Sequence, residues 1–222
     1  MLFNVLKAMA KSPQPTRVTD RKRRIDGERS RSAILDAAAQ LATVEGIGGL
    51  SLSRLAGEVG MSKSGLFAHF GSKEELQLAT VDRANELFDD QVLEPALTAP
   101  TGLERLQGLA ERYLRYVEAE TFRGGCFFAT VLTEVDMQPG PVRDRLVRFL
   151  GDWLGQLEGA VRDAQGEGAI DAAEDPAQLA FEIEAALFLA NAQFVVARGP
   201  EPIRRAERAI NRRLAEATTG AA

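Results

Sequence analysis

From about residue 28 onward, apolar residues recur along the chain at helical spacing. The first set consists of Ile34, Ala37, Ala38, Leu41 and Val44. Intervals of three and four residues place such a set on one face of an amphipathic helix, and Gly46 supplies the left-handed residue that commonly ends one. Few segments alternate with the period of two that is typical of a half-buried strand. The pattern therefore predicts an all-α fold.

The next three predicted helices each begin at a serine, namely Ser51, Ser62 and Ser72. A serine side chain accepts a hydrogen bond from the free N–H groups of the first helical turn. Glu75, three residues after Ser72, completes the sequence pattern of a capping box. Only Gly60 and Met61 separate the first two of these helices, which is as tight as the turn of a helix-turn-helix. The third helix is predicted to continue to about residue 93 and to end before Pro95.

Beyond Pro100 the pattern predicts longer helices, over residues 103–120, 126–135, 141–165, 176–198 and 202–217. Proline occupies the first turn of three of them, where its missing N–H costs no hydrogen bond. The helix over residues 176–198 has Ile183 and Leu187 on one apolar face. A second apolar face carries Phe181, Ala185, Phe188, Ala192 and Val196. A helix that is apolar on two faces is buried on both, either inside a bundle or against a partner.

The short helix over residues 62–70 shows small side chains where a surface helix normally shows charge. On a helical wheel Leu66 and Phe70 face the core, so Ser64 and Ala68 point outward. Small outward side chains allow a helix to enter the major groove of DNA, where a serine can bond to a base edge and an alanine can touch a thymine methyl. The cationic or titratable residues bordering this face, placed to reach phosphates, are Lys63, His69 and Lys73.

Charge is distributed unevenly along the chain. Residues 1–75 carry 12 of the 27 Lys and Arg against 8 of the 32 Asp and Glu, which leaves 15 against 24 for residues 76–222. A basic N-terminal part on an acidic remainder indicates that only the N-terminal part meets a polyanion. The basic run at residues 21–24 has two interpretations, a solvated tail or a contact with the minor groove or phosphates.

Residues 50–76, with the sequence LSLSRLAGEVGMSKSGLFAHFGSKEEL, closely resemble the DNA-binding head of TetR/AcrR transcriptional regulators. The close match covers about residues 28–80, and the rest resembles the family as a helical body of the right length. The resemblance implies a three-helix helix-turn-helix domain and a C-terminal helical bundle for ligand binding and dimerisation, with about nine helices in all. We therefore expect a flexible basic arm at 1–27, a DNA-binding domain at 28–75 and a ligand-sensing and dimerisation domain at 76–222.

The resemblance also implies the DNA contacts, which map onto Ser53, Arg54, Ser62, Lys63, Ser64, Gly65, Phe67, Ala68, His69 and Lys73. Tyrosine is common in the family where this chain has Phe67, so a phenolic bond to phosphate is absent here. An acidic residue is common where this chain has Arg54, which is a candidate for an additional phosphate contact. Two alternatives stay open: His69 packs or caps at a helix end, and Phe67 lies in the core. Ser62 caps its helix in either case.

Aromatic residues of the body are candidates for lining an effector cavity between helices, although packing in an ordinary core is the alternative for each. They are Tyr113, Tyr116, Phe122, Phe127, Phe128, Phe149 and Trp153. By resemblance the last two helices form a dimer interface, for which Phe181, Ala185, Phe188, Ala192 and Val196 are the candidates. A dimer matches a palindromic operator, and the acidic body favours a neutral or cationic effector.

Composition limits the remaining chemistry. One cysteine, Cys126, and one histidine, His69, provide neither a disulfide nor the ligand spacing of a metal site, and we expect no cofactor. Cys126 is either a buried, inert thiol or a redox sensor.

No apolar run approaches the ~20 residues of a membrane span, and the apolar stretch at the start of the chain is too short for a signal peptide. We therefore expect a cytoplasmic protein without a membrane partner.

The predicted function is that of a bacterial homodimeric repressor that binds double-stranded palindromic operator DNA and is released by an unknown small-molecule effector. The first alternative is an activator, or a regulator of the same fold that senses no ligand. The second is an all-helical enzyme or small-molecule-binding protein. It is disfavoured because no nucleophile elbow, phosphate-binding glycine loop or metal-ligand cluster is visible. The carboxylates that remain for catalysis, Glu134, Asp136 and Glu184, have no distinguishing pattern.

Overall fold

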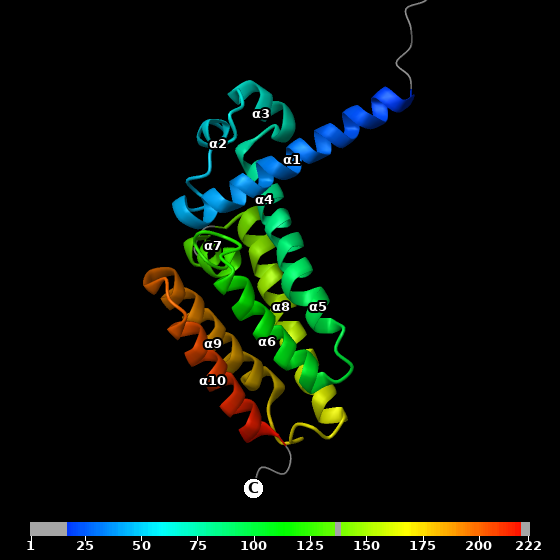
Figure 1. Ribbon diagram of the computed structural model, residues 1–222, viewed down its shortest axis with the longest axis vertical. Coiled ribbons are helices and arrows are strands. Elements are labelled where there is room, and N and C mark those ends of the chain that lie inside the picture. Colours follow the sequence, from blue (N-terminus) through cyan, green and yellow to red (C-terminus); the bar gives the residue numbers. More distant parts are fainter. Residues whose placement is uncertain (1–16, 136–138, 219–222) are drawn as a thin grey trace, which may run out of the picture.

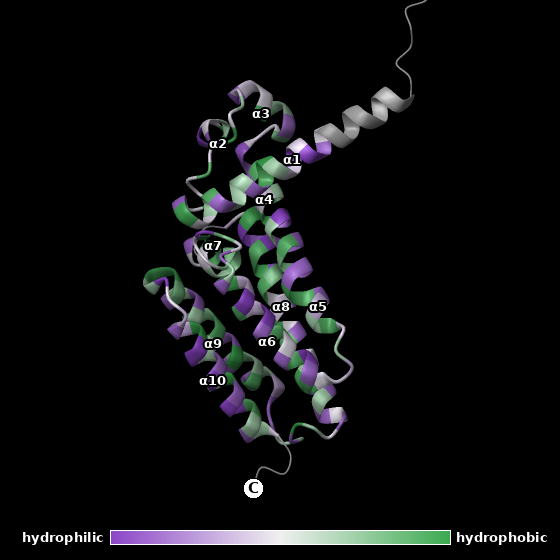
Figure 2. Ribbon diagram, viewed as in Figure 1, coloured by the Kyte–Doolittle hydropathy of each residue, from purple (hydrophilic) through white to green (hydrophobic). Residues whose placement is uncertain are grey.

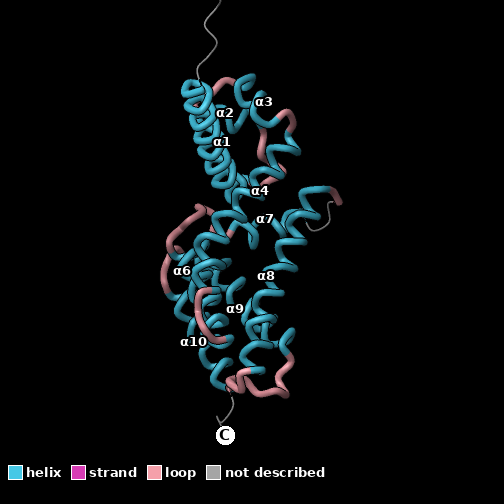
Figure 3. Tube along the Cα trace, turned by 90° about the vertical axis from the view of Figure 1, so that its right-hand side faces the viewer, coloured by secondary structure: helices cyan, strands magenta, loops and turns pink. Residues whose placement is uncertain are grey.

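The computed structural model describes residues 17–135 and 139–218, with side chains from residue 27 onward. Its helices are α1 (Arg17–Glu45), α2 (Leu52–Val59), α3 (Lys63–Phe70), α4 (Lys73–Phe88), the π-helical turn η1 (Asp89–Leu93), α5 (Glu94–Leu97), α6 (Gly102–Glu118), α7 (Phe127–Val135), α8 (Pro141–Gly166), α9 (Pro176–Ala197) and α10 (Glu201–Ala217). No strand forms within the described residues (Figure 3). Because α4, η1 and α5 are continuous, these residues form nine helices, and the predicted all-α fold is confirmed.

The molecule consists of a small head and an elongated body (Figure 1). The head contains α2, α3 and part of α1, while α4 runs from the head into the body beside α8. The antiparallel pair α9 and α10 lies along one side of the body, and hydrophobic residues gather where the body helices face one another (Figure 2). Two hydrophobic cores result, and both include residues of α1 and α4. These two helices therefore connect the packing of the head to that of the body.

All three predicted serine caps are present. The Oγ atoms of Ser51, Ser62 and Ser72 accept hydrogen bonds from the backbone N–H groups of Arg54, Gly65 and Glu75, respectively. Gly60 ends α2 in the left-handed region, at φ 66°, which allows the tight turn into α3. The predicted capping box at Ser72 is incomplete, because the backbone N–H of Ser72 donates to the Phe70 carbonyl. A capping box with both of its hydrogen bonds forms at Thr101, where α6 begins.

The first helix begins earlier than predicted. We expected the helical pattern to start near residue 28, but α1 begins at Arg17. Residues 17–26 contain neither proline nor glycine, so no residue in this stretch interrupts a helix that continues from the head. The later part of the predicted arm is therefore helical, whereas residues 1–16 of that arm lie outside the described residues.

The prediction that a helix ends before Pro95 is wrong. Pro95 lies within α5, and the chain passes it through η1, where the N–H of Glu94 bonds to the carbonyl of Asp89 five residues before it. In a regular α-helix the ring of Pro95 clashes with the carbonyl four residues earlier, and its missing N–H breaks a hydrogen bond. A π turn widens the helix at this point, so the helical rod continues past the proline.

α9 has one buried side and one bare side. Leu179, Ile183, Leu187 and Phe194 are buried in the body core. On the other side, Phe181, Phe188, Leu189 and Val196 are 64%, 39%, 56% and 86% exposed. By length and composition alone this helix of 22 residues is able to cross a membrane, which corrects our expectation that no apolar run approaches that length. In the structure some apolar side chains of α9 pack in the body core and the others are exposed on its bare side.

Candidate nucleic-acid interface and effector cavity

The outward face of α3 is uncharged, as the wheel predicts. Leu66 and Phe70 are buried in the head core, while Ser64, Phe67 and Ala68 are exposed. Phe67 is 54% exposed, so the alternative that it belongs to the core is excluded. An exposed aromatic ring beside two small side chains forms a narrow ridge with little desolvation cost on entering a groove.

The other predicted contacts lie around this ridge. Ser53 is exposed on α2, Ser62 and Lys63 are exposed where α3 begins, and Gly65 is half-buried. His69 is half-buried in the last turn of α3, which leaves its packing alternative open. Arg31, which the sequence did not single out, lies 4.6 Å over the Phe70 ring and donates a hydrogen bond to the His69 carbonyl. Arg31 therefore holds the end of α3 against α1.

Two of the expected phosphate contacts are engaged within the head. The Arg54 guanidinium pairs with Glu45 at 2.7 Å and with Glu58 at 3.0 Å, and these carboxylates raise its pKa. The Lys73 ammonium donates to the Gly48 carbonyl at 2.6 Å. The phosphate contact for which Arg54 is a candidate would therefore compete with two carboxylate partners within the head.

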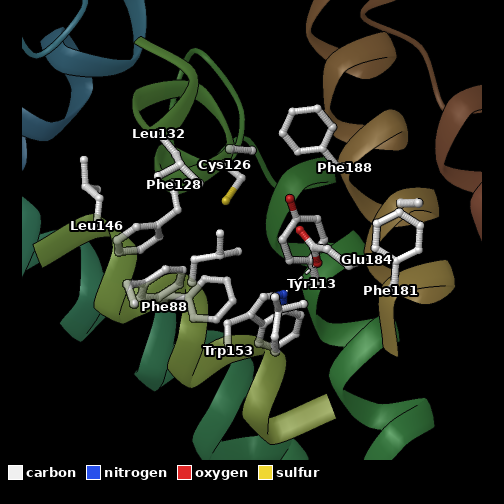
Figure 4. A pocket seen from close by; sticks show the side chains of 15 residues that line it. Phe88, Tyr113, Cys126, Phe128, Leu132, Leu146, Trp153, Phe181, Glu184 and Phe188 are labelled. Atoms are coloured by element: carbon white, nitrogen blue, oxygen red, sulfur yellow. Dashed lines mark hydrogen bonds between the residues drawn. The ribbon is translucent and has the colours of Figure 1, made fainter. Parts of the chain in front are cut away.

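The body contains a cavity of about 360 Å³ between α4, α6, α8, α9 and the start of α7 (Figure 4). Four of the seven predicted aromatic residues line it: Tyr113, Phe128, Phe149 and Trp153. The other three, Tyr116, Phe122 and Phe127, are buried in the core but do not line the cavity, which corrects their assignment. Phe127 and Phe128 are neighbours in α7 and point in different directions, so only the latter reaches the cavity.

Phe88, which we did not predict, is at the centre of the cavity's aromatic wall. Its ring packs edge-to-face against Tyr113, Phe149 and Trp153, with centroids 6.2, 5.1 and 5.2 Å away. Such edge-to-face arrangements are the favourable geometry for aromatic rings. Its place in the apolar pattern of α4 marks it as a core residue, and only the packing of α4 against α8 and the ring contact with Tyr113 of α6 place it at the cavity.

Three polar groups face this otherwise apolar space. Glu184 of α9 accepts a 2.6 Å hydrogen bond from the indole N–H of Trp153, and burial raises the pKa of its carboxyl to about 7. The buried Tyr113 hydroxyl has no hydrogen-bond partner among the described residues, and burial raises its pKa well above the usual value. The third group is the Cys126 thiol.

We predict that the Cys126 thiol is chemically inert in the folded protein. It is 2% exposed, and burial raises its pKa to about 11. At pH 8 the thiolate fraction is then lower than in an unfolded chain, whose thiol pKa is about 8.5, by roughly 200-fold. Iodoacetamide labelling followed by mass spectrometry should show native Cys126 reacting at least about 100-fold more slowly than the urea-denatured chain. Labelling of both states at similar rates would instead favour the redox-sensor interpretation.

α7 joins the cavity to the head. Phe128, Ala129 and Leu132 of this helix line the cavity. Near its end the two carboxylate oxygens of Glu134 accept hydrogen bonds from the backbone N–H groups of Ile47 and Gly48, both at 2.7 Å. These amides belong to the loop between α1 and α2. A shift of α7 would therefore displace this loop of the head.

Replacing Glu134 by alanine should loosen this loop. Each charge-assisted hydrogen bond contributes about 1–3 kcal/mol, so loss of the pair should accelerate amide exchange in residues 46–50 by about tenfold or more. Hydrogen–deuterium exchange followed by mass spectrometry measures this rate. Glu118→Ala, at an exposed position on α6, is the matched control and should leave the loop unchanged. Equal exchange in both variants would show that Glu134 does not hold the loop.

Family models match two parts of the chain. The model described as bacterial regulatory proteins, tetR family, matches residues 34–80. The model described as tetracyclin repressor-like, C-terminal domain, matches residues 102–210. None of the curated proteins compared with the chain matches it.

Several solved structures share the fold. A TetR transcriptional regulator from Chloroflexus aurantiacus J-10-FL has a TM-score of 0.81 and 23% identity, over 87% of this chain and 98% of that one. A TetR-family regulator from Cytophaga hutchinsonii has a TM-score of 0.76 and 17% identity, over 87% and 97%. AibR, in complex with isovaleryl coenzyme A and operator DNA, has a TM-score of 0.66 and 24% identity, over 83% and 95%. With both parts of the chain matched by the family's models, this protein belongs to the TetR family of DNA-binding transcriptional regulators.

Proposed function

We propose that this regulator is a homodimeric repressor that inserts α3 into a palindromic operator and leaves it when a small molecule fills the body cavity. The observation that carries the proposal is the exposed, uncharged ridge of Ser64, Phe67 and Ala68, with Lys63 beside it. Solvent-exposed helix faces usually carry charged side chains, and this face carries none. Its serine, phenylalanine and alanine are instead suited to contact base edges and thymine methyls.

The bare side of α9 supports dimerisation. Monomeric proteins rarely leave large apolar patches uncovered, and this side presents two phenylalanines, a leucine and a valine to solvent. A second copy covers the stripe by an isologous contact between the same side of both α9 helices. Two heads on a two-fold axis then meet two operator half-sites about one helical turn apart.

The position of the cavity supports control by an effector. Phe181, Ala185 and Phe188 both line the cavity and belong to the bare side of α9, so an effector here contacts the proposed dimer interface. Through α7 and Glu134 the same cavity reaches the loop between α1 and α2. The AibR complex contains an acyl coenzyme A together with operator DNA, which illustrates that a protein of this fold binds both kinds of partner.

Selection of bound duplexes from a random DNA pool tests this function. We expect enrichment of a palindrome whose half-sites are about one helical turn apart, bound about 1,000-fold or more tightly than random duplex at physiological salt. Affinity should fall steeply as salt rises, because phosphate contacts release counterions. Equal affinity for selected and random duplexes would refute operator recognition. Reporter expression with and without the gene then distinguishes a repressor from an activator.

A further inference from the structure

The cavity has one carboxylate and no cation among its lining residues. Glu184 is the acidic residue, and neither lysine, arginine nor histidine contributes to the described wall. The neighbouring acidic residue of α9, Glu182, points away from the cavity and pairs with Arg213 at 2.5 Å. An anionic ligand would therefore meet a like charge and no partner, which disfavours acids and phosphates at this site.

Glu184 has few hydrogen-bond partners for a half-buried carboxylate. Among the described residues its one hydrogen-bond donor is the neutral indole N–H of Trp153, whereas a carboxylate has room for about four hydrogen bonds. Burying an ionised group without a counter-charge is unfavourable, and a cation that binds beside it offsets part of this cost. Tyr113, whose hydroxyl has no hydrogen-bond partner among the described residues, lines the same cavity (Figure 4).

The other residues that line the cavity favour a ligand whose remaining atoms, apart from the cationic group, are apolar. Aromatic faces attract ammonium groups, tryptophan most strongly, and Trp153 stacks with Tyr113 next to Glu184. Phe128, Leu146, Leu150 and Leu154 add hydrophobic side chains to the lining. A volume of about 360 Å³ suits a small molecule with one or two rings or an equivalent alkyl chain.

From this geometry we propose that the effector is a lipophilic primary or substituted amine, whose ammonium group pairs with the Glu184 carboxylate while its apolar body fills the aromatic part of the cavity. This inference rests on the proposed function only in taking the cavity as the effector site. The binding itself is measured on the protein without DNA.

Trp153 provides a direct readout, because it is the single tryptophan of the chain and lines the cavity. Three probes share one apolar body and differ in charge: 4-phenylbutylamine, 4-phenylbutan-1-ol and 4-phenylbutyrate. In fluorescence titrations of the full chain at pH 8, we expect the amine to bind about tenfold or more tightly than the alcohol, with the acid weakest. Equal binding of amine and alcohol, or no quenching by the amine, would overturn the proposal.

The variant Glu184→Gln removes the charge and keeps an oxygen that accepts the Trp153 N–H. Its preference for the amine over the alcohol should fall to within about threefold, whereas the control Glu118→Gln keeps the wild-type preference. Circular dichroism and operator binding confirm that the variant is folded. Retention of the full preference by Glu184→Gln would show that the carboxylate does not select the ligand.

The pH dependence gives a test that needs no variant. The titratable groups facing Glu184 are the Tyr113 hydroxyl and the Cys126 thiol, and burial keeps both protonated at neutral pH. The probe's ammonium, with a pKa near that of lysine, stays charged, while Glu184 gains a proton below its pKa of about 7. Between pH 8 and pH 6 the amine affinity should therefore fall about tenfold and the alcohol affinity should stay constant. A flat amine profile would contradict pairing with Glu184.

The two proposals fail in different ways. A chain that selects a palindrome but shows no amine preference refutes the ligand class and leaves operator recognition intact. A chain that binds the amine through Glu184 but treats all duplexes alike refutes operator recognition and leaves the cavity assignment in place.

Discussion

Replacing Ala68 by glutamate should lower operator affinity by about 100-fold or more, because a like charge placed against the DNA costs several kcal/mol. Ala68 is exposed on α3, on the side away from the buried Leu66 and Phe70. The substitution at an exposed helical position should change the free energy of unfolding by no more than about 0.5 kcal/mol. Fluorescence anisotropy with the selected operator measures the affinity, and thermal unfolding measures the stability.

The control for Ala68→Glu introduces the same change far from the head. Ala172 is exposed in the turn between α8 and α9, and Ala172→Glu should bind the operator with wild-type affinity. Because both variants carry the same additional charge, a difference between them reports the position of the charge. Wild-type affinity of Ala68→Glu would mean that the outward side of α3 does not meet DNA.

Replacing Ala192 by glutamate should convert the proposed dimer into monomers of 24.1 kDa. Ala192 is exposed near the middle of the bare side of α9, between Phe188 and Val196. In the proposed dimer this glutamate would be buried without a partner, at a cost of several kcal/mol. Sedimentation equilibrium at micromolar concentration measures the mass.

Operator binding should weaken together with the dimer. A monomer presents one head, loses the gain from binding two linked half-sites, and should bind the palindrome about 100-fold less tightly. It should keep its affinity for a duplex that contains one half-site. Ala172→Glu again serves as the control and should sediment at twice the monomer mass. A monomeric wild-type chain, or an Ala192→Glu variant that remains dimeric, would refute this interface.

Local sequence patterns were sufficient for much of the fold. A serine cap involves only the next three residues, so Ser51, Ser62 and Ser72 identify helix starts without knowledge of the rest of the chain. The alternation of buried and exposed positions in α3 follows from 100° of rotation per residue and from which residues are apolar. The same reasoning finds the two apolar sides of α9, although it does not distinguish a side that is buried from one that is bare.

Pairs distant in sequence were not predictable in this way. Arg54 has an acidic neighbour one turn later in Glu58, but its second partner, Glu45, belongs to another helix, and the angle between α1 and α2 decides whether they meet. Likewise, Glu184 has no distinguishing motif, and its role depends on α8 placing Trp153 within hydrogen-bond distance. The passage of the chain beyond Pro95 depends on a π turn that no propensity rule anticipates.

By itself, the sequence determined the helical nature of this protein, the starts of its short helices and the uncharged outward face of α3, because these depend on neighbours within one or two turns. Only the tertiary structure decided which aromatic rings surround the cavity, that Glu184 is the single carboxylate among its described lining residues, and that α7 connects the cavity to the head. Those features depend on the rotation and spacing of packed helices, which the whole core settles together.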